Sequence, residues 1–495
     1  MRGRAGVVGL CRSLYVASVF ILTIGLARAM GTQEFGSFQQ VFIFSAVFLI
    51  LMLGIPEALY FFLPRLTDDE RPRFIGQTLT ILALTGTACA FLFWFGAPFL
   101  SGVQENPVII GRMRLFGIYG AFYIAAAFTD PFFITYGRIG YLFVVNTVHA
   151  LFFVGITVWY IAAKGSADTL FASMAVFGGL RYLLSLYLLS RMRSIFGSIR
   201  FSGGRSMALL LLSFSLPVML STTVEILSRW LDKYVVSFFF GTEALGIFYV
   251  GAMEIPFIGV IVSSIYSVVS PVLNTRHHEG DTGGFVSLAS KTLSFTAKIV
   301  WPLFAWFIVF ADHIILLVFT EQYRQAILPF RVYLAMMPLR IASYGVLVIA
   351  LGRPRLVFWS AAIALGVNFV LNIVFAQTMG MVGPAVATVV SSYFHVALLM
   401  IIILRELDVG IGDLIPFRWL IGLGMTCGLS VLIAYGMTYT MTDNLAVVLM
   451  SFLIFSVAFL FFGSKAGFGK FTKFLDIAGG LPGGTQSDSG TSRRS

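Results

Sequence analysis

The chain has 495 residues, of which 58% are hydrophobic and 11% are charged. A soluble domain has about 25% charged residues, so this composition excludes a largely water-exposed protein and indicates one embedded in lipid. The formal net charge of +11 is spread over short loops, which excludes nucleic acid as a partner. Cys11, Cys89 and Cys427 lie far apart in apolar segments, and this spacing predicts neither a disulfide framework nor a metal site.

The first part of the chain contains six apolar stretches that are long enough to cross a membrane, for which about 20 residues are needed. They are predicted at residues 8–29, 36–63, 74–100, 111–135, 140–162 and 169–190. Residues 1–190 are therefore expected to form an N-terminal six-helix lobe. The polar stretch at residues 191–206 is predicted to be a cytoplasmic linker between two lobes.

A second set of six apolar stretches follows this linker. They are predicted at residues 207–231, 245–272, 292–318, 327–351, 356–378 and 382–404, so residues 207–404 are expected to form a C-terminal lobe. A further helix pair, 415–438 and 443–463, lies within residues 405–463, and residues 464–495 are predicted to be a disordered cytoplasmic tail. The expected fold class is an all-α polytopic membrane protein with about fourteen transmembrane helices.

A short repeat marks the two halves. Gly31–Phe38 and Gly241–Phe248 share the frame G-T-x-x-x-G-x-F, and each follows one apolar stretch and precedes another. This pattern indicates a transporter built from two similar halves. The first helix resembles a signal peptide, but its counterpart before Gly241 lies inside the chain. We therefore expect the first helix to be retained.

The distribution of Lys and Arg predicts the orientation. Far more of these residues lie in the loops and ends that are cytoplasmic when the N-terminus is inside. An even number of spans then puts the C-terminus inside as well. Both copies of the repeat fall on the external side, so the two halves are predicted to run in the same direction as parallel repeats.

No motif for nucleotide or metal chemistry is visible. Ser464–Phe471 has Ser where the first Gly of a P-loop is required and Phe after Lys470. His277 and His278 are adjacent in a polar loop, where their side chains do not converge on a metal. We therefore expect no cofactor, no metal and no enzymatic activity.

Charged residues inside the apolar spans are the candidate functional residues, because each is costly in lipid. The acids are candidates for ion coupling, and the bases are candidates for binding an anionic headgroup such as a pyrophosphate. The acids are Glu57, Asp130, Glu225, Asp232 and Glu254, and the bases are Arg28, Arg181, Arg229, Lys298 and Arg340. Pairing of the bases with the acids between helices is the alternative for both sets.

The position of some of these charges gives further detail. Glu225, Arg229 and Asp232 are spaced four and three residues apart, so they share one helix face. This face fits either a local salt-bridge ladder or the wall of a water-filled cavity. Glu57 and Glu254 lie beside prolines at predicted helix breaks, which fits either a proton or cation site or a packing kink.

Four stretches carry a resemblance to a known family. They are Ala27–Phe38; Leu212–Pro217 with Arg229–Lys233; Gly241–Phe248; and Asn368–Asn372 with Gly380–Thr388. In this order and spacing they resemble the polysaccharide flippases of the multidrug/oligosaccharidyl-lipid/polysaccharide exporter superfamily. Pro384 departs from the pattern, since the family usually has a small residue there.

The resemblance implies two six-helix lobes around a central cavity and an alternating-access mechanism. It implies movement of a polyprenyl-pyrophosphate-linked oligosaccharide across the cytoplasmic membrane, coupled to H⁺ or Na⁺, for the biosynthesis of O-antigen, capsule or exopolysaccharide. Asp232 matches a residue that is usual in the family's seventh helix. Membrane lipids and other polysaccharide-assembly proteins are the further partners expected.

Two other classes of function remain open. A cation-coupled drug exporter of the same superfamily would have a net acidic cavity and twelve helices, whereas fourteen helices and deep cations favour the flippase. A membrane polymerase or ligase for polysaccharides would present a large external loop with catalytic residues, and the sequence has no such loop.

Overall fold

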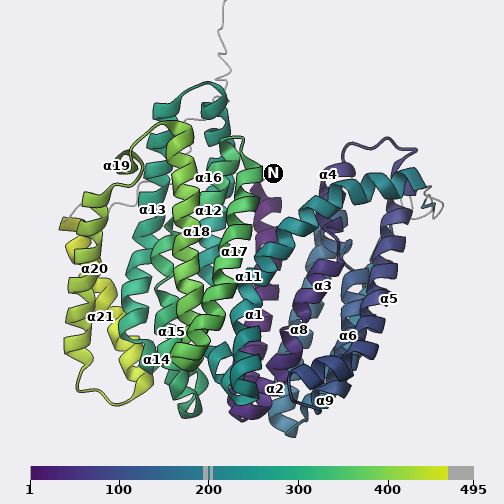
Figure 1. The fold of residues 1–495 in the computed structure, drawn as a ribbon, viewed down its shortest axis with the longest axis horizontal. Helices are drawn as coiled ribbons and strands as arrows, with labels where there is room; N and C mark the ends of the chain where they lie inside the picture. The colour runs from purple at the N-terminus through teal and green to yellow at the C-terminus, as the bar shows by residue number, and fades with distance from the viewer. Residues whose placement is uncertain (1, 193–198, 201–204, 466–495) are drawn as a thin grey trace, which may run out of the picture. The chain divides into compact units, whose positions relative to one another are not determined.

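In the computed structural model every regular element within the described residues is a helix, as the apolar stretches predict (Figure 1). The structure describes residues 2–192, 199–200 and 205–465. Most of the predicted linker at 191–206 and nearly all of the predicted tail at 464–495 therefore lie outside the described residues.

The first half of the chain forms the predicted helices, several of them broken. The elements are α1 (Arg2–Ala29), α2 (Thr32–Phe42), α3 (Ser45–Leu51), α4 (Ile55–Phe62), α5 (Arg71–Val103), α6 (Ile109–Ala125), α7 (Thr129–Thr135), α8 (Ile139–Ala163) and α9 (Ala167–Ser190). The predicted span 36–63 thus corresponds to α2, α3 and α4. The residues between α3 and α4 include Leu53 and Gly54, whose φ angles are 54° and 65°. These angles are left-handed and cannot continue a right-handed helix, so the predicted span is broken there.

Helix α11 (Arg205–Gly251) is longer than the sequence predicts. It continues through the predicted loop between spans 207–231 and 245–272 and bends at Gly241, where φ is 79° and ψ is −167°. Glycine adopts this conformation without steric cost. The predicted span 245–272 is wrong as a single helix, because Ile255 is extended before Pro256 and separates α11 from α12.

The second half contains more short elements than the first. They are α12 (Pro256–His278), α13 (Thr282–Val309), α14 (Ala311–Phe319), η1 (Glu321–Ala326), α15 (Ile327–Leu334), η2 (Met337–Ile341), α16 (Tyr344–Ala350), α17 (Pro354–Met379), η3 (Gly380–Val382), α18 (Gly383–Leu407), α19 (Ile411–Leu414), α20 (Phe417–Thr438) and α21 (Asn444–Lys465). Here η denotes a 3₁₀ helix, and η2 interrupts the predicted span 327–351.

The described residues hold 11 helices that are long and apolar enough to cross a membrane, or 12 if one bent pair counts as a span. The sequence predicts about fourteen. The difference has three sources. The apolar part of α1, Ser13–Ala29, is shorter than a full span, Glu321–Leu334 and Met337–Ala350 form the bent pair at 44°, and Pro354–Leu407 counts as one stretch of 54 residues although it contains both α17 and α18.

The chain divides into two compact units. Unit 1 comprises Met1–Met253, Ile315–Tyr333 and Ala361–Ser391, and unit 2 comprises Glu254–Ile314, Leu334–Ser360 and Ser392–Ser495. These contact units do not test the lobe boundaries at 190 and 207, which stay predictions.

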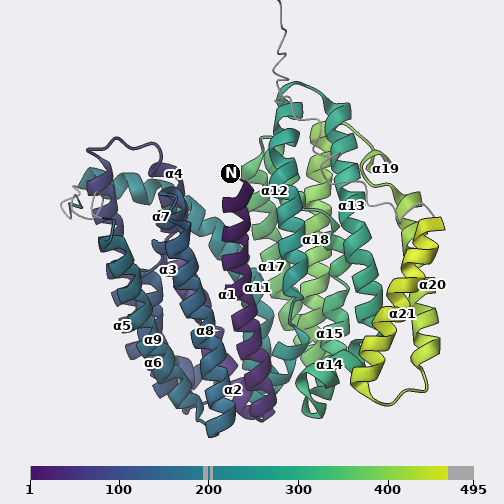
Figure 2. The same ribbon diagram turned by 180° about the vertical axis from the view of Figure 1, so that it is seen from behind.

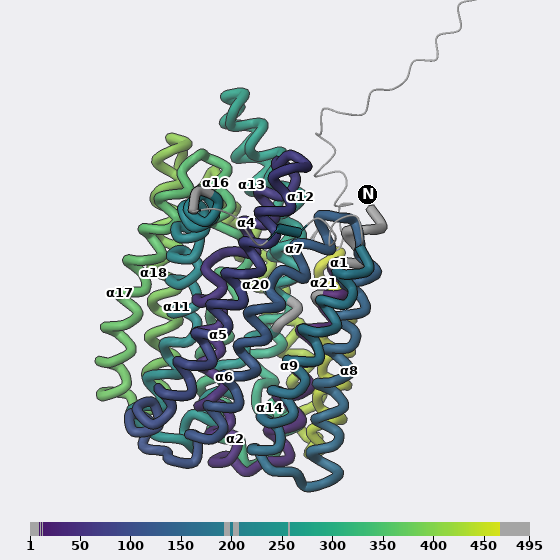
Figure 3. The backbone as a smooth tube through the Cα atoms, turned by 90° about the vertical axis from the view of Figure 1, so that its right-hand side faces the viewer, coloured from purple at the N-terminus to yellow at the C-terminus, as the bar shows by residue number. Residues whose placement is uncertain are grey.

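In unit 1, α5 packs on α6, α6 packs on α9, and α1 packs on α8, as Figures 1 and 3 show from two directions. Their interior is aromatic. The ring of Phe48 lies 4.8 Å from that of Phe116, and the ring of Phe38 lies 5.1 Å from that of Phe171. Contacts of this kind add to the packing energy of buried rings and hold the α1–α9 helices around the candidate site.

The two copies of the repeat contact each other within unit 1, where α2 packs on α11. A Cβ atom on Gly36 would lie 1.8 Å from the carbonyl oxygen of Thr242, and one on Gly246 would lie 2.3 Å from that of Thr32. Thr32 Oγ1 also donates a hydrogen bond of 2.9 Å to Glu243 Oε1. Both turns therefore lie at the same end of unit 1, as expected, and the glycines permit a close crossing of two backbones.

In unit 2, α20 packs on α21, and α13 packs on α20 and α12 (Figure 2). A buried cluster joins α13 to the C-terminal pair and includes Trp306, Val431 and Phe455. Trp306 Nε1 donates a hydrogen bond of 3.2 Å to Ser451 Oγ, which satisfies the indole N–H in this apolar setting.

Candidate functional site

A cavity of about 390 Å³ lies in unit 1 beside two helix breaks. One break, at Leu53 and Gly54, begins α4, and the other, between Ala125 and Thr129, begins α7. Each short helix carries an acid in its first turn, Glu57 in α4 and Asp130 in α7, where the positive end of the helix dipole favours a carboxylate. Both carboxylates line the cavity.

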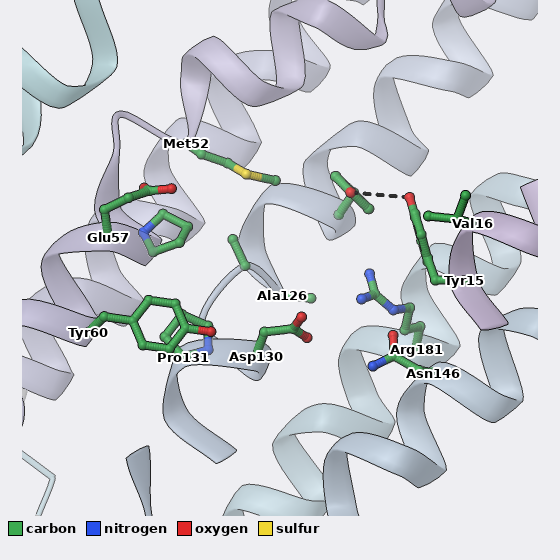
Figure 4. Close-up of a pocket in the computed structure, with 13 residues that line it drawn as sticks. Tyr15, Val16, Met52, Glu57, Tyr60, Ala126, Asp130, Pro131, Asn146 and Arg181 are labelled. Carbon is green, nitrogen blue, oxygen red and sulfur yellow. Dashed lines mark hydrogen bonds between the residues drawn. The ribbon is translucent and has the colours of Figure 1, made fainter. Parts of the chain in front are cut away.

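Arg181 of α9 lines the same cavity and brings a cation to the two acids (Figure 4). The residue is only 9% exposed, and its guanidinium lies 5.5 Å from the centroid of the Tyr123 ring. Its Nε makes no hydrogen bond among the described residues. Figure 4 shows the guanidinium and the Asp130 carboxylate turned into the same space. Each of these charges is costly within an apolar span, so the three residues that line this cavity are functional candidates.

Polar residues that the sequence did not single out complete the cavity. Tyr15 and Tyr123 hydroxyls lie 3.4 Å apart, and Asn146 of α8 contributes an amide. Behind this lining, His149, one turn further along α8, is fully buried with its ring centroid 4.6 Å from that of Tyr15 in a tilted arrangement. In the sequence, Asn146 and His149 are two polar residues three positions apart inside an apolar span, and this spacing could have indicated a polar helix face.

The size of this cavity limits its ligand. At about 30 Å³ for each water molecule, it holds roughly a dozen waters. That is enough for a hydrated ion or a small molecule and not for an oligosaccharide. The arrangement of two carboxylates and one guanidinium can bind and exchange a small cation.

A second pair of predicted residues meets in unit 2. Arg340 Nη2 donates to Glu254 Oε1 at 2.8 Å, and Arg340 Nη1 donates to Glu254 Oε2 at 3.2 Å. This is the bidentate geometry that makes an arginine–carboxylate pair strong and directional. Glu254 lies in the break between α11 and α12, and Arg340 lies in η2. The helix break predicted at Glu254 is confirmed. Arg340 pairs with an acid, which is the alternative to substrate binding that the sequence left open for this base.

Asp232 is held inside unit 1. Its side chain is 1% exposed and lies 3.2 Å from Lys233 Nζ, while Thr388 Oγ1 donates a hydrogen bond of 3.5 Å to Asp232 Oδ2. Lys233 Nζ is also 5.8 Å from the centroids of the Trp230 and Tyr333 rings. The Asp232 carboxylate, which matches the family's helix-seven motif, is therefore paired with Lys233, its neighbour in the chain.

Glu225 and Arg229 form the local ladder that their spacing allows. They are 2.6 Å apart, and both side chains are mostly exposed. Asp232, one turn further along, contacts Lys233 and Thr388.

Replacing Arg229 with glutamine is therefore expected to have little effect. Exposed pairs at this helical spacing contribute about 0.3–0.5 kcal/mol, so transport activity and the melting temperature of the purified protein should stay close to wild type. A loss of transport as large as that expected for the cavity residues would return Arg229 to the functional set.

The remaining two bases have structural contacts. Arg28 Nη1 donates to the carbonyl oxygens of Leu317 and Val318, at 2.7 and 3.1 Å, near the C-terminal end of α14. Capping free carbonyls at a helix end is a common role for arginine. Lys298 of α13 lies 5.7 Å from the Trp419 ring centroid, a cation–π contact within unit 2.

Comparison with known proteins assigns the family. The sequence model described as "Polysaccharide biosynthesis protein" matches residues 25–328, which is more than half of the chain. The chain belongs to this polysaccharide biosynthesis protein family. No curated protein sequence matches the chain.

Solved structures agree on the fold of this family member. The structure described as "Lipid II flippase MurJ, inward closed conformation" is similar with a TM-score of 0.74 and 14% sequence identity, covering 94% of this chain and 100% of that one. A mutant of the Vibrio cholerae MATE transporter VcmN is similar with a TM-score of 0.52 and 13% identity, covering 83% and 100%. The family member is thus a multi-pass, all-helical membrane protein with a MurJ- and MATE-like transporter fold.

Proposed function

We propose that the protein moves a polyprenyl-pyrophosphate-linked oligosaccharide across the cytoplasmic membrane by alternating access, for O-antigen, capsule or exopolysaccharide biosynthesis. The observation that carries the proposal is the cavity of unit 1, whose lining includes Arg181, Asp130 and Glu57 next to two helix breaks. Support comes from the family's part in polysaccharide biosynthesis and from a fold similar to that of a lipid II flippase.

The proposal includes an architecture. The chain crosses the membrane fourteen times, with α1 and both α17 and α18 as separate spans, and both termini are cytoplasmic. Residues 1–190 and 207–404 form two parallel six-helix lobes around a central cavity that holds the lipid-linked sugar. Residues 405–463 add a helix pair, and residues 464–495 form a cytoplasmic tail.

Ion coupling is proposed for the carboxylates of Asp130 and Glu57. When both are ionised, the charged groups that line the cavity sum to one negative charge, so the cavity attracts H⁺ or Na⁺ in a low-dielectric setting where charges interact strongly. A bound cation neutralises a carboxylate and weakens its attraction for Arg181. The breaks before α4 and α7 allow these helices to respond, because their backbones are not part of a continuous helix.

The test follows the substrate. Cells that lack the protein are expected to accumulate the lipid-linked oligosaccharide on the cytoplasmic side, where an impermeant sugar-modifying reagent cannot reach it. Proteoliposomes with the purified protein should expose a fluorescent polyprenyl-pyrophosphate-linked sugar to an external quencher faster under a proton or sodium gradient. Normal export in the deletion strain together with no exposure in liposomes would refute the proposal.

A cation-coupled exporter of small molecules is the second candidate. Two observations favour it, namely two carboxylates to one guanidinium in a cavity of small-molecule size, and a fold shared with a MATE transporter. Overexpression should then confer resistance to cationic drugs, and the drug should accelerate dissipation of the ion gradient in liposomes. The flippase proposal expects neither effect.

A further inference from the structure

The bidentate pair between Arg340 and Glu254 occupies an unusual place in unit 2. Neither residue lies within an α-helix, since Glu254 follows the end of α11 and Arg340 lies in η2. The side chain of Arg340 is 32% exposed and that of Glu254 is 45% exposed. Two N–H groups of the Arg340 guanidinium are therefore bound to a carboxylate that solvent and ligands can still reach.

The electrostatic surroundings favour an anion at this position. Helices α12 and α13 pack on η2, which contains Arg340, and α16 packs on α12; none of these three helices contains an acidic residue. Their other charged or titratable groups are Tyr266, Arg276, His277, His278, Lys291, Lys298 and Tyr344. Glu254 is thus an anion beside α12, α13 and α16, whose fixed charges are positive, while the acids Glu225, Asp232 and Glu243 lie further back along α11.

We propose that the Glu254 carboxylate occupies the anion site of Arg340 and that a diphosphate displaces this carboxylate. A diphosphate presents oxygens that match the planar guanidinium fork as a carboxylate does, and it carries more charge. When it binds Arg340, the Glu254 carboxylate is released next to a second anion. The released carboxylate then takes up a proton, so Arg340 ends paired with the diphosphate and Glu254 ends neutral.

This exchange gives the pair a function in coupling. The diphosphate binds to Arg340 and the proton binds to Glu254, so the site formed by this pair takes up both ligands. Each ligand increases the affinity for the other, because a coupling free energy between two sites is reciprocal. The inference rests on the proposed function in that the natural diphosphate is taken to be the headgroup of a lipid-linked sugar.

The backbone at both residues can accommodate the exchange. Ile255 is extended immediately after Glu254, and Ala342 is extended two residues after Arg340. Loop and element-terminal residues of this kind absorb changes in φ and ψ during conformational change. Separation of the pair therefore does not require a continuous helix to break.

The experiment measures binding of farnesyl diphosphate and of inorganic pyrophosphate to the purified full-length protein in detergent, by calorimetry in two buffers of different ionisation enthalpy. Wild type should bind more tightly as the pH falls and should take up more protons than Glu254→Gln does. Glu254→Gln frees Arg340 and should bind at least about threefold more tightly near neutral pH, since an ordinary exposed ion pair is worth about that factor and a bidentate pair is worth more. Arg340→Ala should lose binding at least tenfold.

Matched controls separate this site from general electrostatics. Glu406→Gln breaks another ion pair of unit 2, that of Arg353 with Glu406, and should change neither affinity nor proton uptake. Glu254→Asp keeps the charge on a shorter side chain and should bind between wild type and Glu254→Gln. Binding of farnesyl diphosphate with no binding of pyrophosphate would identify a lipid headgroup as the source of the anion.

The outcomes distinguish the inference from the proposed function. Diphosphate binding that is equal in wild type and Glu254→Gln, with equal proton uptake, would overturn the exchange and leave the flippase proposal intact. Glu254-dependent binding in a protein that flips no lipid-linked sugar would support the exchange for another diphosphate. No binding by wild type at any pH would overturn the exchange.

Discussion

Replacing Arg181 with alanine is expected to reduce transport at least tenfold. The guanidinium is the cation that accompanies Asp130 and Glu57 in the unit 1 cavity. Without it, two carboxylates share a small, largely apolar space, where like charges disfavour ionisation of both. The cavity would then hold a proton permanently and could not exchange it. The measurement is gradient-driven exposure of the lipid-linked sugar in proteoliposomes, normalised to the amount of folded protein.

A double variant separates transport from folding in this cavity. Removing one partner of a direct buried ion pair costs about 3–5 kcal/mol, whereas removing both is often nearly neutral. The same direction, with a smaller effect, is expected for opposite charges that share a cavity. Arg181→Ala combined with Asp130→Asn should therefore recover thermal stability relative to Arg181→Ala alone and should still fail to transport. Wild-type transport by either variant would exclude Arg181 from the mechanism, and Arg229→Gln provides the comparison with an exposed arginine.

Replacing Gly36 with alanine is the second large effect that we expect, this time on folding. The added methyl group would lie 1.8 Å from the carbonyl oxygen of Thr242, and a backbone oxygen cannot move aside as a flexible side chain can. Overpacking in a tightly packed interior costs about 1–3 kcal/mol. The melting temperature in detergent and the yield of folded protein should both fall.

The same motif offers the control for this prediction. Gly31 begins the same repeat, and a Cβ atom there has no neighbour within 4 Å, so Gly31→Ala should leave stability close to wild type. Gly246→Ala should resemble Gly36→Ala, since its Cβ atom would lie 2.3 Å from the carbonyl oxygen of Thr32. Equal stability of the Gly31 and Gly36 variants would contradict the close crossing of α2 and α11.

The helix breaks show what the sequence could predict and where its information ended. The prolines at 56 and 256 predict helix breaks near Glu57 and Glu254, and both breaks are confirmed. Gly241 was recognised from the repeat, but the helical conformation of residues 232–240 was not. These residues include Asp232 and Lys233, charges that interrupted the apolar pattern and yet pair within the helix.

The candidate site was harder to predict because its members come together only through tertiary packing. Arg181, Asp130 and Glu57 were each identified by the cost of a charge in lipid, while their convergence on one cavity depends on how α4, α7 and α9 pack. The same holds for Arg340 and Glu254, which are 86 residues apart in the chain. Tyr15 and Tyr123 carry no signal in a sequence so rich in aromatic residues.

The contact between the two repeats has a reciprocity that bears on how such a protein arose. Gly36 approaches Thr242, and Gly246 approaches Thr32, at equivalent positions of the two copies. In a symmetric homodimer the same rule holds, since residue i of one subunit meets residue j of the other and j meets i. The crossing of α2 and α11 thus has the form of a dimer interface contained in one chain. Duplication of one half would produce this arrangement, because each copy then meets its own equivalent.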